Sequence, residues 1–396
     1  MSLAVGIVGL PNVGKSTTFN ALTRAQNAQS ANYPFCTIEP NKALVNVPDD
    51  RLYELAKIAK PQRILHSVIE FVDIAGLVKG ASKGEGLGNK FLSNIRECET
   101  ILHIVRCFED GNITHTEGGV NPVRDIEIIN TELILADIEQ LSKKIEKLTR
   151  EAKANAKGAK ESLELANKLL AHLNLGKSAG SFAEKDSELF VNLNKDLRLL
   201  SAKEVIYGAN VDEAGISEDN EFVKALKTYA EKNSNEVIKL CAKIEEELIS
   251  LDESESAELL ASLGAKESGL AQIIRVAFGK LGLISYFTAG DIEVRSWTIK
   301  KGCKAPKAAS VIHNDFEKGF IKAEVISYDD FIACGGESKA KEAGKLRLEG
   351  KDYVVQDGDI MHFRFNVVLD GSLVGKKDVA PNIPECFLAC KNLFEE

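Results

Sequence analysis

The sequence lacks the features of secreted, membrane-spanning and disulfide-rich proteins. No signal peptide leads the chain, and no apolar run is long enough to cross a bilayer. The eight cysteines form no C-x-x-C pair, and a chain of 396 residues does not depend on a disulfide framework. Cys386 and Cys390 lie close together in the sequence, but two ligands alone do not make a zinc site. We therefore expect a cytoplasmic protein with reduced thiols and no membrane contact.

A surplus of basic residues is also absent. The net charge of −9 excludes a general attraction to nucleic acid, so we predict no DNA binding, although a local basic stripe is compatible with this charge. Hydrophobic residues make up 44% and charged residues 28% of the chain, as in ordinary globular proteins. The length indicates two or three domains.

The first positive feature is a phosphate-binding loop, Gly9-Leu-Pro-Asn-Val-Gly14-Lys15-Ser16, between an apolar run and a helical stretch. Its two glycines let the backbone curl so that N–H groups meet the phosphates of a nucleoside triphosphate. Lys15 supplies the positive charge that catalysis needs there, and the Ser16 hydroxyl completes the shell of an Mg²⁺ ion. The sequence therefore predicts a nucleotide site.

A second nucleotide signature is the run Ser67-Val-Ile-Glu-Phe-Val-Asp73-Ile-Ala-Gly76. It reads as an apolar strand that ends in an aspartate, with a glycine three residues later. We expect Asp73 to hold Mg²⁺ through water and the Gly76 N–H to meet the γ-phosphate, which makes Gly76 a catalytic candidate and a sensor of hydrolysis.

Further short apolar runs separated by helical stretches predict an α/β fold, a doubly wound parallel sheet with ligands at the carboxyl ends of the strands. These runs are Thr100 to Val105, Glu204 to Ala209 and Glu236 to Leu240.

A different pattern lies between the first and second of these three runs. Leucine and isoleucine recur at steps of three and four from Ile134 to Leu148 and again from Leu163 to Leu173, with a break near Gly158. This spacing predicts an antiparallel helical hairpin inserted in the nucleotide domain. Basic residues gather toward its tip, either as a solvated face or as a probe for RNA phosphates. They are Lys143, Lys144, Lys147, Arg150, Lys153, Lys157 and Lys160.

The pattern changes once more after Gly282. Leu283 to Phe287 and Ile292 to Ile299 read as one hairpin, and Tyr353 to Val355 and Ile360 to Phe365 read as another. With a helical stretch at residues 308–318 between them, these runs predict a small α+β domain of about 85 residues.

The base-reading segment differs from that of guanine-specific switches, which use Asn-Lys-x-Asp. Here the segment is Asn210-Val211-Asp212-Glu213, which lacks the lysine and ends in a longer acid. Adenine presents an acceptor where guanine presents a donor, so loss of the aspartate removes the penalty against adenine. We expect the Asn210 side chain and the Val211 backbone to bond adenine, with the Val211 side chain as an apolar wall. ATP is preferred, but GTP stays open because a one-residue slip would present Asp212 to guanine.

The residues that would direct hydrolysis are unusual. Leu77 stands where many related hydrolases place a water-orienting glutamine, and leucine cannot hydrogen-bond water. His115 is a candidate replacement by chemistry alone, although a lone loop histidine is also compatible with simple solvation. Thr37 is a candidate second hydroxyl ligand of Mg²⁺. The glycine-dense run from Lys79 to Gly88 is expected to become ordered by nucleotide or a partner.

Taken together, Gly9 to Thr17, Asp73 to Gly88, Asn210 to Glu213 and the β-rich C-terminal region closely resemble the YchF / Obg-like ATPase family, over essentially the whole chain. That family belongs to the translation-factor-related P-loop class and binds ATP at least as well as GTP. The resemblance implies an Obg-type G domain at 1–130 and 203–281 and an inserted coiled coil at 131–202. It further implies a TGS domain of β-grasp fold at 283–367 and a C-terminal tail, 368–396, packed on the body.

The resemblance also implies roles for single residues. The nucleotide contacts by motif position are Asn12, Val13, Gly14, Lys15, Ser16, Thr17 and Val211, and the magnesium ligands are Ser16 and Thr37. Ala242, in a Cys-Ala-Lys run where the family usually has Ser-Ala, would face the base with its backbone N–H. A loop histidine matching His115 would replace the missing glutamine, and Asn12 matches an asparagine that holds an activating K⁺ in some related hydrolases.

Three functions fit these observations. The leading one is an ATP-hydrolysing switch that docks on ribosomes or rRNA, since family members associate with ribosomes and with stress responses. The second is a P-loop kinase that transfers the γ-phosphate to a small metabolite. The third is an RNA-binding scaffold whose nucleotide is structural and is never hydrolysed.

Overall fold

The computed structural model describes residues 4–29, 41–74, 87–113, 115, 118–366, 368–369 and 372–373. The chain divides into two compact units, one made of Met1–Val45 and Ile69–Ala277 and the other of Asn46–Val68 and Phe278–Glu396. Across the described ranges, no helix combines the length and apolar character needed to cross a membrane.

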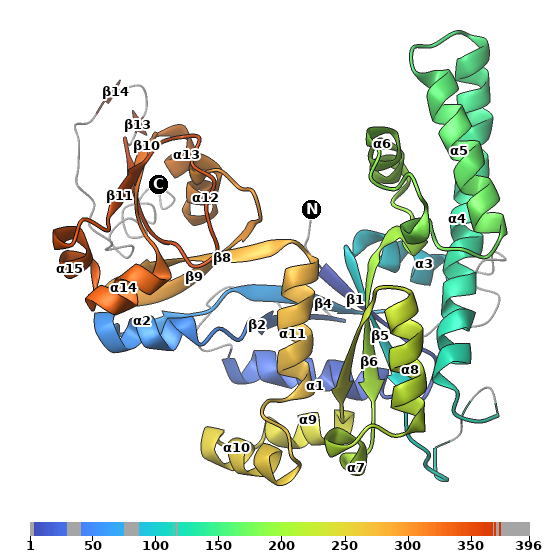
Figure 1. Ribbon diagram of the computed structural model, residues 1–396, viewed down its shortest axis with the longest axis horizontal. Helices are drawn as coiled ribbons and strands as arrows, with labels where there is room; N and C mark the ends of the chain where they lie inside the picture. Colours follow the sequence, from blue (N-terminus) through green and yellow to red (C-terminus); the bar gives the residue numbers. More distant parts are fainter. Residues whose placement is uncertain are drawn as a thin grey trace, which may run out of the picture. The chain divides into compact units, whose positions relative to one another are not determined.

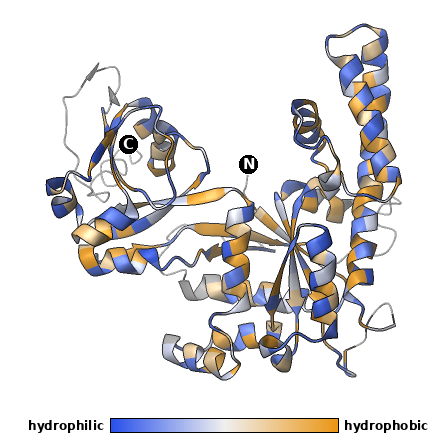
Figure 2. Ribbon diagram, in the orientation of Figure 1, coloured by the Kyte–Doolittle hydropathy of each residue, from blue (hydrophilic) through white to orange (hydrophobic). Residues whose placement is uncertain are grey.

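The first unit is built on a six-stranded sheet of order β2-β4-β1-β5-β6-β7, in which the five strands from β4 to β7 run parallel (Figure 1). Every residue of β1 and β5 is buried, as expected for a parallel sheet covered on both faces. Figure 2 shows these strands as largely hydrophobic and the surrounding helices as mixed. The strands are β1 (Ala4–Val8), β2 (Lys42–Asn46), β4 (Val68–Asp73), β5 (Thr100–Arg106), β6 (Glu204–Asn210) and β7 (Glu236–Leu240).

The predicted doubly wound α/β fold is therefore confirmed, while the edge strand β2 was not predicted. The helices around this sheet are α1 (Lys15–Gln29), α3 (Leu87–Glu97), α7 (Glu213–Ser217), α8 (Glu221–Lys232), α9 (Ala242–Leu248), α10 (Glu253–Ser262) and α11 (Gly269–Lys280).

The predicted helical hairpin is formed by α4 (Pro122–Lys153) and α5 (Ala159–Asn174), which lie side by side (Figure 1). Gly158 connects them with a φ of 75°, a left-handed conformation that favours glycine. The buried leucines of the predicted repeat, among them Leu141, Leu148 and Leu169, share one core with α6 (Glu188–Leu197) and with the short 3-10 helices η3 (Ala179–Ser181) and η4 (Leu200–Ala202). The predicted boundary at residue 130 differs from the structure, because α4 is one continuous helix across it.

The second unit contains a sheet of order β11-β10-β12-β8-β9-β3. The β8–β9 hairpin is antiparallel, and β12 lies parallel to β8, as in a β-grasp domain. The strands are β3 (Arg63–Leu65), β8 (Leu283–Ala289), β9 (Glu293–Lys300), β10 (Phe320–Ile326), β11 (Arg347–Glu349) and β12 (Ile360–Phe365). The helices are α2 (Arg51–Ala59), α12 (Ala305–Ile312), α13 (Asn314–Lys318), α14 (Tyr328–Cys334) and α15 (Glu337–Glu342).

Two sequence-based expectations about this unit need correction. The second predicted hairpin is wrong, because Ile360–Phe365 pairs with β10 and β8, and Val354 forms an isolated bridge to Lys304 instead. In addition, Asn46–Val68 was placed in the nucleotide domain but belongs to this unit, where β3 extends the sheet beside β9. Of the predicted tail, the structure describes the short strands β13 (Val368–Leu369) and β14 (Ser372–Leu373).

Candidate functional site

The phosphate loop connects β1 to α1, as predicted. Asn12 and Gly14 have φ values of 62° and 94°, so the loop turns through the left-handed region twice. A Cβ atom on Gly14 would lie 2.1 Å from the Asn210 amide nitrogen, so a larger residue does not fit there. The Thr18 N–H and hydroxyl both donate to the Gly14 carbonyl, at 2.9 and 3.0 Å, which fixes the start of α1. The loop thus has the curled form that presents N–H groups to an anion.

Lys15 and Asp73, which were predicted to meet the phosphates and Mg²⁺, lie together. The Lys15 ammonium donates to Asp73 Oδ1 at 2.7 Å and to the Ile74 carbonyl at 3.0 Å. The Lys15 side chain is 10% exposed and that of Asp73 is 19% exposed. The structure therefore brings the two predicted motifs to one point at the carboxyl ends of β1 and β4.

The residues present fit a magnesium ion. Ser16, the second residue of α1, is exposed, and Asp73 ends β4 with its carboxylate beside the loop. One hydroxyl and one carboxylate, with the remaining positions left to water and phosphate oxygens, is the donor set that Mg²⁺ prefers. Thr37 and Gly76, the other predicted participants, lie outside the described residues, as do Leu77 and the run from Lys79 to Gly86.

Asn210 has a different role from the predicted one. Its Nδ2 donates to the Val13 carbonyl at 2.9 Å, and its Oδ1 accepts from the Ala242 N–H at 3.0 Å. The side chain is buried, so it links the phosphate loop to the start of α9. The Ala242 N–H, expected to face the base, is used in this link. Asn210 is therefore primarily a positioning residue for the two loops around the nucleotide.

The side chain of Val211 does not form the predicted apolar wall, and its backbone N–H is already bonded. Its side chain is 1% exposed and packs among Val105, Tyr207 and Leu226, so it is part of the core instead of an apolar wall for the base. Its N–H donates to the Leu240 carbonyl at 2.9 Å and is not available to adenine. A residue directly after a strand can face either the core or the site, and the sequence pattern does not distinguish these cases.

Asp212 and Glu213 have separate functions. Asp212 caps α7, since its carboxylate accepts from the Gly215 N–H at 2.9 Å. Glu213 lies 3.0 Å from the Lys243 ammonium, and both side chains are more than half exposed. The use of Asp212 as a cap argues against the one-residue slip that would present this acid to guanine. Lys243 was not predicted as a partner, although it follows Ala242 directly.

His115 is paired with Asp125, an acid that the sequence pattern did not indicate as its partner. Its Nε2 lies 2.9 Å from Asp125 Oδ2, and the two side chains are 6% and 2% exposed. Arg124 bonds the other Asp125 oxygen at 3.0 Å. Asp125 stands at the start of α4, four residues after the helix-capping Asn121, and nothing in its spacing to His115 indicates a pair. The structure shows the imidazole held against α4.

A buried arginine shapes the loop that leads to His115. Arg106 is 1% exposed and donates to the carbonyls of Phe108, Asp110 and Ile113 at 3.0, 3.2 and 3.0 Å. These bonds to backbone oxygens fix the conformation of residues 107–113 after β5. A charged residue at the end of a fully buried strand was the available sequence signal for this role.

Six of the seven predicted basic residues of the hairpin fall into two groups, while the exposed Arg150 donates to the Glu146 carbonyl at 3.3 Å. Lys143, Lys144 and Lys147 form ion pairs with acids on α4 and α6. The lysines nearest the tip are Lys153, Lys157 and Lys160. All three are exposed, and they form no ion pair with any residue in the described part of the chain. The tip therefore carries positive charge that is not neutralised by this part of the chain.

Comparison with known proteins identifies relatives over almost the entire chain. A family model described as 50S ribosome-binding GTPase matches residues 4–168, and the YchF-GTPase_C model, described as a protein of unknown function, matches residues 283–366. The chain is 53% identical over 371 residues to the "Ribosome-binding ATPase YchF" of Bacillus subtilis, with 93% of this chain and 100% of the relative covered. For the protein of the same name from Escherichia coli O157:H7 the identity is 52% over 370 residues, with the same coverage.

A solved structure shows the same similarity in three dimensions. The Schizosaccharomyces pombe YchF GTPase aligns with a TM-score of 0.81 at 40% sequence identity, covering 92% of this chain and 98% of that chain.

Proposed function

Because the chain belongs to the YchF family, we propose that it is a P-loop ATPase, a slow molecular switch that docks on ribosomes or their RNA. The observation that carries the proposal is the convergence of Lys15 and Asp73 at 2.7 Å beside the phosphate loop. Lys15 would bind the β- and γ-phosphates, and Ser16 with Asp73 would hold Mg²⁺. When bound, Mg²⁺ neutralises charge that develops on the phosphate oxygens.

The choice of ATP over GTP rests on the side chains after β6. Guanine-specific binding needs a free carboxylate aimed at the base edge. Asp212 is used as a helix cap, and the Glu213 carboxylate is paired with Lys243. Both acids therefore have partners that compete with guanine, while adenine requires no such acceptor. GTP would bind as a weaker alternative.

Slow intrinsic hydrolysis is expected because neither of the two candidate residues is ready to orient the attacking water. Leu77 lacks a hydrogen-bonding group. His115 is buried against Asp125, and in the proposed switch its imidazole leaves that position to reach a water molecule near the γ-phosphate. A partner that displaces His115 would then accelerate the reaction, as expected for a switch.

Ribosome docking is supported by charge at the hairpin tip. Lys153, Lys157 and Lys160 are exposed there, and phosphate backbones attract such clusters. We assign the hairpin, within residues 131–202, and the TGS domain at 283–367 as the parts that contact the ribosome. A cytoplasmic location is the corresponding expectation.

The test is a paired calorimetric titration with ATP and GTP in the presence of Mg²⁺, on the wild type and Lys15→Ala. We expect ATP to bind more tightly than GTP and Lys15→Ala to bind neither. Equal ATP affinity of the wild type and Lys15→Ala would overturn the proposal. Binding of GTP at least tenfold tighter, about 1.4 kcal/mol, would refute the base assignment.

Phosphate release separates the proposed function from the alternatives. Release that is slow alone and faster with purified ribosomes supports the switch. Phosphate transfer only on addition of a small metabolite indicates a kinase, and absence of release with ribosomes indicates a scaffold. His115→Ala is expected to reduce the ribosome-stimulated release at least about tenfold, the usual scale for a positioned catalytic group, while leaving ATP affinity unchanged.

A further inference from the structure

A cluster of possible metal ligands lies on the sheet of the second unit, which contains no part of the phosphate loop. Glu324 of β10 and His362 of β12 are directly opposite each other in the antiparallel register. Both are partly buried, whereas their neighbours Ala323, Val325 and Phe363 are buried in the core. Since side chains alternate between the two faces of a strand, Glu324 and His362 project from the same, opposite face.

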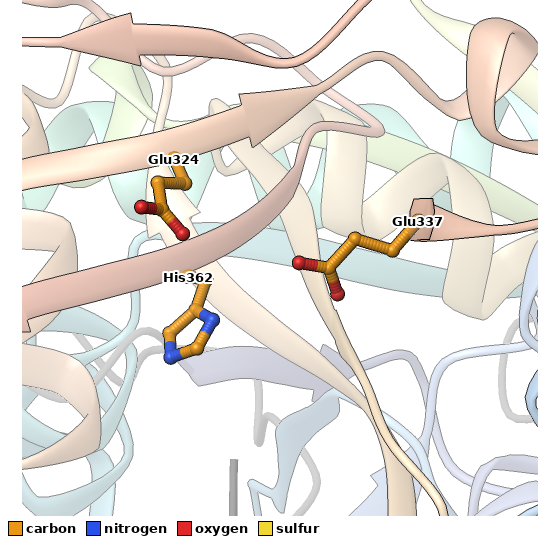
Figure 3. A group of neighbouring side chains, drawn as sticks. All are labelled: Glu324, Glu337 and His362. Atoms are coloured by element: carbon orange, nitrogen blue, oxygen red, sulfur yellow. The ribbon is translucent and has the colours of Figure 1, made fainter. Parts of the chain in front are cut away.

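A third ligand comes from a different element. Glu337 is the first residue of α15, and Figure 3 shows its carboxylate directed toward the space beside Glu324 and His362. One ligand atom from each of the three residues lies within 4.8 Å of the other two. The register of β10 and β12 brings Glu324 and His362 together, but neither this register nor helix capping requires a third ligand from α15 at the same point.

We propose that Glu324, Glu337 and His362 form a binding site for a divalent transition-metal ion, with Zn²⁺ as the best match. Imidazole with carboxylates suits Zn²⁺, whereas Mg²⁺ and Ca²⁺ take oxygen ligands almost exclusively. Metal–ligand bonds of about 2.1 Å place neighbouring ligand atoms about 3.4 Å apart, so the cluster must contract slightly on binding. Glu337 is exposed and has three rotatable side-chain bonds, so it can make this adjustment.

Arg364 limits the affinity of the site. Its guanidinium donates to Glu324 Oε2 at 3.1 Å, which leaves the other oxygen of that carboxylate for a metal ion. Removal of the arginine charge should therefore strengthen metal binding. Three protein ligands also leave at least one coordination position open, as in sites that accept water or a ligand from a partner.

The site would connect α15 to the sheet. This helix has six residues, and Gly336 at its N-cap provides no side-chain hydrogen bond. A metal ion held by Glu337 and by two strands would replace that missing anchor, so metal binding should stabilise the second unit.

The competing explanation is an ordinary polar network in which His362 and the two carboxylates interact without a metal ion. The test is calorimetric titration of the full chain, without nucleotide, with Zn²⁺, and parallel titration with Co²⁺ followed by absorption spectroscopy. Co²⁺ distinguishes this site from adventitious binding to cysteines, because nitrogen and oxygen ligands give no thiolate-to-metal charge-transfer band.

We expect one Zn²⁺ site that is weakened at least about tenfold in Glu337→Gln and in His362→Gln, since each removes a direct ligand. Glu342→Gln, on the exposed surface of the same helix, is the matched control and should bind as the wild type does. Arg364→Gln should bind more tightly than the wild type.

Thermal unfolding with and without Zn²⁺ checks that the variants are folded. Zn²⁺ should raise the unfolding temperature of the wild type and of Glu342→Gln, but not that of Glu337→Gln. Equal Zn²⁺ affinity in the wild type, Glu337→Gln and His362→Gln, or Co²⁺ spectra dominated by thiolate bands, would overturn the proposal. None of these outcomes depends on ATP hydrolysis.

Discussion

The Lys15 ammonium lies 2.7 Å from the Asp73 carboxylate, so the group that would bind phosphate and the group that would hold Mg²⁺ are paired with each other. A triphosphate that binds to Lys15 would compete with this carboxylate for the ammonium. The released Asp73 would then be available to hold Mg²⁺ through water. Phosphate binding and magnesium binding should therefore be coupled through these two side chains.

Asp73→Asn tests this coupling. Because the variant lacks the carboxylate that would hold Mg²⁺ through water, the gain in ATP affinity on addition of Mg²⁺ should fall at least about tenfold, or 1.4 kcal/mol. ATP affinity in EDTA should change little or rise, since Lys15 is no longer held. Calorimetry with Mg²⁺ and with EDTA measures both. Glu70→Gln, on the same strand and paired with Lys42, is the control. An undiminished Mg²⁺ effect in Asp73→Asn would contradict the coupling.

Asn210→Ala should weaken both stability and nucleotide binding. It leaves the Val13 carbonyl and the Ala242 N–H without their partner, and each buried unsatisfied group costs about 1–3 kcal/mol. Urea unfolding and ATP titration measure the two effects. Asn220→Ala is a suitable control, because Asn220 caps α8 and contacts the Cys107 carbonyl. Asn220→Ala should lose about 1 kcal/mol of stability and retain ATP affinity. Equal ATP affinity in Asn210→Ala and the wild type would refute the linking role.

Local sequence was sufficient to predict the phosphate loop and the parallel sheet. Gly9 to Ser16 is a contiguous motif, and the strands are runs of buried residues whose periodicity is visible directly. The function of Asn210 was not predictable in the same way. An amide at a strand end offers a donor and an acceptor, and its two partners, at residues 13 and 242, come from distant parts of the chain.

The errors in the second unit have a similar physical cause. The three-residue strand β3 carries too little periodicity to assign, and its place is determined by pairing with β9, about 230 residues later in the sequence. The Arg63 guanidinium bonds the buried Glu293 carboxylate at 2.7 Å across this pair. For β12, proximity to Tyr353–Val355 suggested a hairpin, but the longer β10 offers six paired positions. Tertiary pairing therefore overrides the short-range turn signal.

The Lys243–Glu213 pair should contribute to base selection. Lys243→Ala frees the Glu213 carboxylate, and Glu213→Asp shortens it to the length that guanine-specific switches use. The double variant should shift the ratio of GTP to ATP affinity toward GTP by about tenfold, because a free carboxylate accepts both guanine protons. Lys243→Ala alone should shift it less, since this exposed pair is weak.

Paired calorimetric titrations with ATP and GTP measure this ratio. Lys224→Ala, which removes an exposed lysine paired with Glu221 on α8, is the control. A lysine at position 211, as in the guanine-specific motif, is not a useful test, because Val211 is 1% exposed and the ammonium would enter the core. An unchanged ratio in the double variant would show that this pair does not select the base.

The last prediction concerns Glu245, a buried carboxylate that links α9 to α11. It is 5% exposed and accepts the Gly269 N–H at 2.7 Å at the start of α11. Burial raises the pKa of Glu245 from 4.5 to about 7. Between these two pH values, Glu245 therefore carries a proton in the folded protein but not in the unfolded chain. The stabilisation from this proton is fully present below pH 4.5 and is lost as the pH rises through about 7.

Glu245→Gln removes the titration while keeping an oxygen that accepts the Gly269 N–H. The unfolding free energy of the wild type relative to Glu245→Gln should fall as the pH rises, with a total change on the order of 3 kcal/mol. Urea unfolding over about three pH units, from about pH 5 to about pH 8, samples most of this change. Taking this difference cancels the contributions of other buried groups to the pH dependence. One of them is His103: burial lowers its pKa to about 3, so its contribution to stability changes with pH in the opposite direction. Glu247→Gln, on the exposed side of α9, controls for loss of one carboxylate. A pH-independent difference between the wild type and Glu245→Gln would show that Glu245 does not take up a proton on folding.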